Sequence, residues 1–138
     1  MRRIICFLIA ICLLVPLALP AAAEESNSVT PRYTHIQRLE ANINFNGSGV
    51  ATCTVTGKAI SASYKVSLQC HFQGYNGTTW MSIRNWYANG NYSATTTQTA
   101  NARADCVDYR LWVLCQILDS SGNVVESATI YEYDYYIS

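Results

Sequence analysis

Apolar and polar residues alternate with a period of two along much of the chain. The clearest run covers residues 64–72, where Tyr, Val, Leu, Cys and Phe occupy every second position and polar residues fill the others. The same alternation occurs over residues 39–45, 51–55 and 107–117. Because successive side chains of a strand point to opposite faces, this period predicts β-strands with one buried face. After residue 23 no apolar period typical of a helix is present.

Clusters of Gly, Asn and Ser separate these runs and predict turns, for example at residues 46–49 and 119–123. We expect Gly57 to end the second strand and Asn89-Gly90 to form a hairpin turn. Three less regular segments complete the predicted set of strands, at residues 80–87, 92–100 and 124–137.

Segment 80–87 carries aromatic residues at both parities, so its buried face is not determined by the pattern. Segment 92–100 is polar and rich in Thr, which favours a position near a sheet edge. Seven strands joined by short turns predict an all-β fold: a single seven-stranded antiparallel β-sandwich.

The N-terminus changes the expected location of this domain. Two arginines after Met1 precede an apolar run over residues 4–19, which Pro16 interrupts and three alanines follow. This run is shorter than the roughly 20 residues that cross a bilayer, and the order of features is typical of a signal peptide. We therefore predict a cleaved signal peptide at 1–23, a flexible lead-in at 24–34 and one domain at 35–138. The mature protein would be secreted and would have no membrane span.

Composition excludes some partners and suggests one covalent feature. Without Arg2 and Arg3 the chain has 7 basic and 9 acidic residues, a net charge of −2, which does not favour nucleic acid as a partner. The four cysteines beyond residue 23 predict two disulfides in an exported protein: Cys53, Cys70, Cys106 and Cys115. No two of them have a C-x-x-C spacing, so no zinc site is predicted, and no other metal or cofactor is expected.

The last two strands raise the question of where the tyrosines of "TIYEYDYYIS" point. Pairing Leu118 with Val124 across the turn at 119–123 sets Tyr109 opposite Tyr133 and Arg110 opposite Glu132. In that register the side chains of Tyr131, Tyr133 and Tyr135 lie in the core. A slip of one residue would reverse every one of them.

Two groups of residues are candidates for a binding surface. The same register leaves an apolar patch on the outer face of the last two strands, which is typical of a partner surface, an oligomer contact or a covered segment: Trp112, Leu114, Ala128 and Ile130. Trp80 and Trp86 lie near turns and are candidates for stacking on sugars, although we expect at least one of the two to fill the core.

Several stretches together resemble a known family. They are "SGVATC", an alternating strand that ends in Phe72-Gln73, "TTWMSIRNW", and "YRLWVLCQILDSSGNVVES". The set is similar to a family of small secreted, immunoglobulin-like or fibronectin III-like β-sandwich proteins of Gram-positive, mostly clostridial, bacteria. The resemblance implies a fold and an export route but no activity. In such sandwiches a tyrosine placed like Tyr109 ties the sixth strand to the preceding loop.

The strand arrangement of this fold also suggests a disulfide pairing. The second and sixth strands face each other from opposite sheets, which favours a Cys53–Cys115 bridge. Cys70 then pairs with Cys106 on the neighbouring strand.

The chemistry expected from the sequence is binding rather than catalysis. His35 and His71 are the two histidines, and neither has a spacing typical of a Ser-His-acid or Cys-His site. We therefore expect a non-enzymatic extracellular protein-interaction module whose partner is another protein. The alternative is a carbohydrate-binding module that binds a glycan at the cell surface, and a secreted hydrolase is the third hypothesis.

Overall fold

A computed structural model describes residues 32–137 of the protein. The predicted signal peptide at 1–23 and most of the lead-in at 24–34 lie outside the described residues. The described chain forms seven strands: β1 (Ile36–Phe45), β2 (Val50–Ala59), β3 (Lys65–Tyr75), β4 (Trp80–Asn91), β5 (Ser93–Asn101), β6 (Asp108–Leu118) and β7 (Val124–Tyr135).

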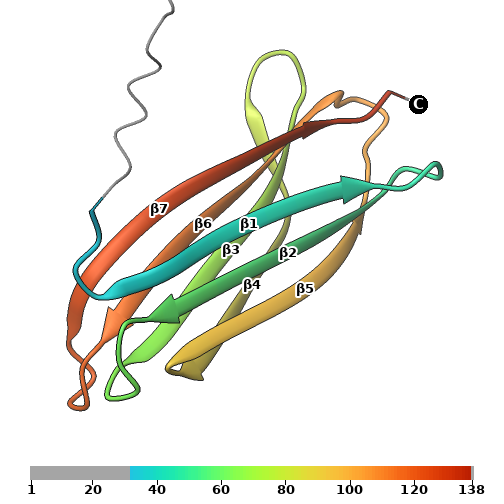
Figure 1. Ribbon diagram of the computed structural model, residues 1–138. Helices are drawn as coiled ribbons and strands as arrows, with labels where there is room; N and C mark the ends of the chain where they lie inside the picture. The colour runs from blue at the N-terminus through green and yellow to red at the C-terminus, as the bar shows by residue number, and fades with distance from the viewer. Residues whose placement is uncertain (1–31, 138) are drawn as a thin grey trace, which may run out of the picture. The chain divides into compact units, whose positions relative to one another are not determined.

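The strands make two sheets, one in the order β1-β2-β5 and the other in the order β4-β3-β6-β7. All neighbouring strands are antiparallel. Strand β1 of the first sheet lies beside β7 of the second (Figure 1). The predicted all-β fold of seven antiparallel strands is confirmed, and β5 lies at a sheet edge as expected. Within residues 32–137 no helix has the length and apolar character needed to cross a membrane.

The core lies between the two sheets and consists of the alternating apolar residues of β2, β3 and β6. Val66, Leu68, Cys70 and Phe72 of β3 are at most 1% exposed, as their alternation predicted. Tyr109, Leu111, Val113, Cys115 and Ile117 of β6 are fully buried. Because each strand places every second residue inward, the two sheets bury these side chains against one another.

Gly57 does not end a strand, contrary to our prediction, and instead lies inside β2. A Cβ atom at this position would lie 2.9 Å from Cδ2 of Leu68 and 3.0 Å from Cγ1 of Val66. The absence of a side chain therefore allows β2 to approach β3 of the opposite sheet closely.

Asn89-Gly90 does not form a hairpin turn either. Both residues lie within β4, opposite Ser67 and Val66 of β3. The chain leaves β4 at Tyr92, whose φ of 69° redirects it into β5 of the other sheet. Since β4 and β5 belong to different sheets, the connection is a crossing between layers rather than a hairpin.

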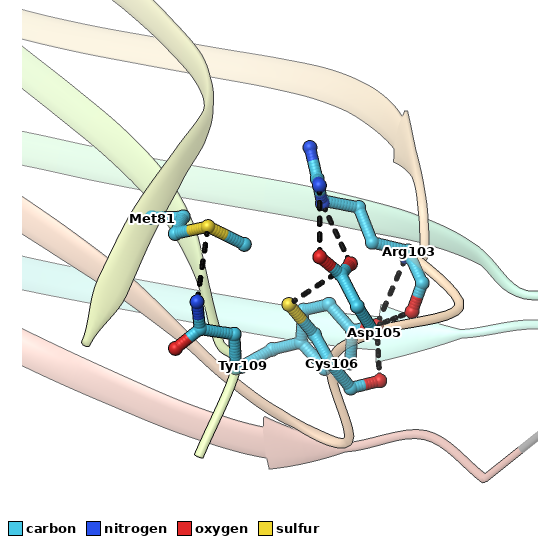
Figure 2. Close-up of polar contacts among 6 residues, drawn as sticks. Met81, Arg103, Asp105, Cys106 and Tyr109 are labelled. Carbon is cyan, nitrogen blue, oxygen red and sulfur yellow. Dashed lines mark hydrogen bonds and ion pairs between the residues drawn. The ribbon is translucent and has the colours of Figure 1, made fainter. Parts of the chain in front are cut away.

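The tyrosine corner implied by the resemblance is present. The hydroxyl of Tyr109 accepts a hydrogen bond from the backbone N–H of Arg103 at 3.1 Å. The same hydroxyl donates toward two carbonyl oxygens, that of Cys106 at 3.0 Å and that of Arg103 at 3.1 Å. These contacts, drawn in Figure 2, fix the loop before β6 to the start of that strand.

Glu126 of β7 holds the chain where it enters β1. Its carboxylate accepts backbone hydrogen bonds from Thr34 at 2.8 Å and from His35 and Ile36 at 2.7 Å each. Burial disfavours the charged carboxylate, but these three N–H groups outweigh that effect and lower the pKa of Glu126.

The predicted disulfides are not formed: all four cysteines of the described chain are buried free thiols. The sulfur of Cys115 lies 3.4 Å from the position that a Cβ of Gly57 would occupy. Cys53 is four residues from Gly57, or about 13 Å along an extended strand. The predicted Cys53–Cys115 bridge is therefore wrong, because its two cysteines lie at different levels of the sandwich.

The second predicted bridge fails for the same reason. The sulfur of Cys106 lies 2.8 Å from a Cβ built on Gly74. Cys70 is four residues from Gly74 on β3, which again corresponds to about 13 Å. Strands β3 and β6 are neighbours as expected, but Cys106 reaches the far end of β3 and not Cys70.

Candidate functional site

The register of β6 and β7 decides which side chains reach the surface. Leu118 pairs with Val124 as predicted, but a bulge between Ile117 and Leu118 shifts the rest of the ladder by one residue. Arg110 consequently lies opposite Tyr133 instead of Glu132, and Tyr109 lies opposite Asp134. The predicted register is therefore wrong for all but its first pair.

The shift reverses the two faces of β7. Tyr131, Tyr133 and Tyr135, which we expected in the core, are 47%, 59% and 69% exposed. Ala128 is buried and Ile130 packs against the core.

The apolar patch predicted on β6 and β7 is therefore not formed. Trp112 and Leu114 lie on the outer face and are partly exposed, whereas Ala128 and Ile130 point inward. Trp112 instead lies opposite Tyr131 of β7.

A second bulge separates the environments of Trp80 and Trp86. It lies in the ladder of β3 and β4, between Phe72 and Gln73. Trp86 lies opposite Cys70 and is 8% exposed, whereas Trp80 lies opposite Tyr75 and is partly exposed on the outer face. The expectation that at least one of these tryptophans fills the core is confirmed, and Trp86 is not available for a surface site.

The outer surface of the β4-β3-β6-β7 sheet thus carries a cluster of rings, which we call the aromatic face. It comprises Tyr75, Trp80, Trp112, Tyr131, Tyr133 and Tyr135. The ring centroid of Trp80 lies 5.2 Å from that of Tyr75 and 6.1 Å from that of Tyr133. Tyr131 and Tyr133 stack with centroids 6.2 Å apart. The rings support one another from three different strands.

Arg110 of β6 lies at the centre of the aromatic face. Its guanidinium carbon is 4.3 Å from the ring centroid of Trp80 and 5.3 Å from that of Tyr131. Its Nε donates a 2.7 Å hydrogen bond to Oε1 of Gln73. The two cation–π contacts and this hydrogen bond restrict the orientation of the guanidinium group.

His71 extends the aromatic face along β3. Its ring makes an edge contact with Trp112, with centroids 4.8 Å apart. Its Nε2 lies 2.8 Å from Nε2 of Gln69. Because an amide nitrogen only donates, the histidine nitrogen accepts this hydrogen bond.

Two open hollows lie on this surface. The larger, of about 510 Å³, is lined by Tyr75, Trp80, Asp108, Tyr109, Tyr133, Asp134 and Tyr135. The smaller, of about 250 Å³, is lined by Gln69, His71, Gln73, Arg110, Trp112 and Tyr131. The larger one offers carboxylates and phenol rings, and the smaller one offers a guanidinium, two amides and an imidazole. Both are lined by aromatic rings together with hydrogen-bonding side chains.

The thiols of the core are not suited to nucleophilic chemistry. Burial raises the pKa of Cys53 and Cys70 to about 12 and that of Cys115 to about 11, so all three remain protonated near neutral pH. Among residues 32–137 no group of three or more His, Cys, Asp or Glu side chains is placed to hold a metal ion.

The sequence contained one signal for the outward position of the tyrosines. In the middle of β7 the aliphatic residues Ala128 and Ile130 have one parity, and Tyr131 and Tyr133 have the other. Aliphatic residues are more often fully buried than tyrosine, whose hydroxyl group is readily solvated. The parity of Ala128 therefore indicates the buried face better than the number of aromatic rings does.

Comparison with known proteins identifies no family. No protein-family model and no curated protein matches the chain. Among solved structures, beta-glucosidase 3B from Thermotoga neapolitana, in complex with glucose and with glycerol, matches with a TM-score of 0.35 and 10% identity. The match covers 75% of this chain and 17% of that enzyme. A likeness of this extent supports no inference about function.

Proposed function

We propose that this protein is a secreted, non-enzymatic carbohydrate-binding protein that holds a saccharide chain on its aromatic face. The observation that carries the proposal is the run of neighbouring rings on one sheet surface, the partly exposed Trp80 and the exposed Tyr133 and Tyr131, with Arg110 in contact with Trp80. A monomeric protein rarely leaves such a contiguous apolar surface uncovered unless a partner uses it.

The chemistry of a sugar suits this surface. A pyranose ring has faces made of C–H groups and an edge made of hydroxyl groups. The aromatic rings supply flat apolar area for the C–H faces. Gln73 and Asp108, which line the two hollows, supply a donor and acceptors for hydroxyl groups.

A protein partner is the competing proposal, because Trp, Tyr and Arg are also common at protein interfaces. The apolar patch on which the sequence-based expectation of a protein partner depended is not formed, since Ala128 and Ile130 point inward. What remains exposed is aromatic and hydrogen-bonding rather than aliphatic. This composition favours a saccharide.

Export and family membership belong to the same proposal. A signal peptide at residues 1–23 would deliver the domain to the outside of the cell, where polysaccharides are accessible. Membership of the clostridial family of small secreted sandwiches is consistent with that location.

Affinity electrophoresis tests the proposal. The mature protein is run through native gels that contain a panel of neutral and acidic cell-wall and plant polysaccharides. We expect retardation by at least one of them, and we expect Trp80→Ala to abolish it. The matched control is Tyr87→Ala, which removes another ring of β4 that is 67% exposed but lines neither of the two hollows described.

Three results would overturn the proposal. One is the absence of retardation by every polysaccharide. Another is equal retardation of the Trp80→Ala variant and the wild type. The third is a dimer in sedimentation analysis that dissociates in Trp80→Ala, together with no retardation, because the face would then be a contact between two copies of the chain.

A further inference from the structure

The geometry points to a saccharide that carries a carboxylate, bound with that carboxylate at Arg110 in the smaller hollow. This inference rests on the proposed function and specifies its ligand as an acidic sugar, such as a uronic acid unit in a chain.

Arg110 has its terminal nitrogens available for a ligand. Its Nε is used by Gln73, and its flat surface is used by the rings of Trp80 and Tyr131. Among residues 32–137 no carboxylate lies within ion-pair distance of its guanidinium group. The two terminal nitrogens form a planar pair of donors whose geometry matches the two oxygens of a carboxylate.

The charge around the smaller hollow suits an anion. Its lining contains Arg110 and His71 together with the amides of Gln69 and Gln73, and it includes no carboxylate. An incoming carboxylate therefore meets a positive charge and N–H donors without an opposing negative charge in the lining. The stacked rings also restrict the access of water to one side of the guanidinium, which strengthens the interaction.

The larger hollow carries negative charge where the smaller one carries positive charge, and this difference orients the ligand. It is lined by Asp108 and Asp134, which accept hydrogen bonds from hydroxyl groups and repel an anion. Trp80 lines this hollow and also contacts Arg110, so the two hollows meet at that ring. A chain that places its acidic unit over Arg110 therefore places a neutral, hydroxyl-rich part beyond Trp80.

The test compares each acidic ligand with its methyl ester, which keeps the sugar chain and removes the negative charge. Binding of hyaluronan oligosaccharides, in which acidic and neutral sugars alternate, and of partly methyl-esterified galacturonate oligosaccharides is measured by titration calorimetry, each beside its fully methyl-esterified form. We expect at least one acidic form to bind about tenfold more tightly than its ester, the scale of a charged hydrogen-bonded pair. We also expect this preference to weaken as salt is added.

Variants of the arginine assign the preference to this side chain. Arg110→Gln is expected to remove the preference, so that the acidic form and its ester bind this variant with equal affinity. Arg110→Lys keeps the charge but loses the paired donors, so an intermediate affinity is expected. Arg38→Gln, which removes an exposed charge from β1 of the other sheet, is the matched control and should leave both affinities unchanged.

The outcomes separate this inference from the proposed function. Equal binding of every acidic form and its ester, lost in Trp80→Ala, would overturn the inference and support the proposed function. Binding of neutral polysaccharides alone would do the same. A preference for the acidic form that survives Arg110→Gln would also overturn the inference. If no saccharide binds, both fail.

Discussion

Replacing Tyr109 by phenylalanine removes one hydroxyl group from the corner that joins the 102–107 loop to β6. The side chain is 0% exposed, and the ring of phenylalanine would keep the contacts with Phe45 and Phe72, whose centroids lie 4.8 Å and 5.6 Å away. What is lost is the acceptor for the N–H of Arg103 and the donor to a carbonyl of the same loop.

The expected cost follows from these two groups. A buried donor or acceptor left without a partner costs about 1–3 kcal/mol. Arg103 itself is exposed, so water reaches its N–H group after a small movement and the cost there is at the low end. We therefore expect Tyr109→Phe to lower the free energy of unfolding by about 2 kcal/mol, or the melting temperature by about 10 °C for a domain of this size.

Urea unfolding followed by tryptophan fluorescence measures this difference. The slope of the transition should be unchanged, because both variants expose the same surface on unfolding. Tyr131→Phe is the control: it removes the hydroxyl of a half-exposed tyrosine on the aromatic face and should change stability by less than about 0.5 kcal/mol. A loss of less than about 0.5 kcal/mol in Tyr109→Phe, or equal losses in both variants, would refute the assignment of a structural role to this hydroxyl.

Three further predictions concern the core and the point where the chain enters β1. Gly57→Ala should lower the free energy of unfolding in urea by about 1–3 kcal/mol, because the added methyl group meets β3 side chains at 2.9–3.0 Å. Gly47→Ala, with nothing within 4 Å, should cost less than about 1 kcal/mol, and equal costs would contradict the close approach of the sheets. In the reduced, folded protein the three core cysteines with raised pKa values should resist alkylation near neutral pH and react only in denaturant, and mass spectrometry showing rapid native labelling would contradict their burial. Glu126→Gln should lower the free energy of unfolding by about 1 kcal/mol at neutral pH. This loss should disappear as the pH falls below 4.5 through the lowered folded-state pKa, because the wild-type carboxylate then also becomes neutral. A difference between the two unfolding curves that does not change with pH would contradict the role of the charge.

The strands were predictable because their signal is local. Alternation over residues 66–72 and 109–117 identified the buried faces of β3 and β6, because every second residue of each run is buried, whereas Val107, expected on the same face, precedes β6 and is exposed. The same reasoning gave the wrong face for β7 and could not decide the face of β4, because each contains or meets a bulge that changes the parity partway along a ladder. A bulge adds one residue without a distinctive sequence, so Trp80 and Trp86 share a parity in the sequence and lie on opposite faces of the sheet.

The predicted cysteine pairing is wrong for a different reason. The expectation that β2 faces β6 and that β3 neighbours β6 was correct. Which residues meet across the sandwich depends on how one sheet is displaced along the other, and this displacement places Gly57, not Cys53, against Cys115. These strand relations follow from the type of sandwich that the resemblance implies, whereas the level at which two sheets pack depends on side-chain volumes throughout the core.

The candidate site depended on the β7 register. In the register expected from the sequence, Tyr131 and Tyr133 fill the core and the exposed patch is apolar, made of Trp112, Leu114, Ala128 and Ile130. Arg110 was expected to pair with Glu132, which would have left no cation for a ligand. The aromatic face and its central guanidinium both result from a shift of one residue.

The three tryptophans provide the most direct test of the aromatic face. Their indole N–H signals, assigned by single Trp→Phe variants, are followed by NMR while an acidic oligosaccharide is added. Trp80 and Trp112 line the two hollows, whereas Trp86 is buried on the core side of the same sheet. We predict that the signals of Trp80 and Trp112 shift on binding while that of Trp86 does not. Saturable binding that shifts Trp86 alone, or none of the three, would contradict the claim that the outer face of the β4-β3-β6-β7 sheet is the binding surface.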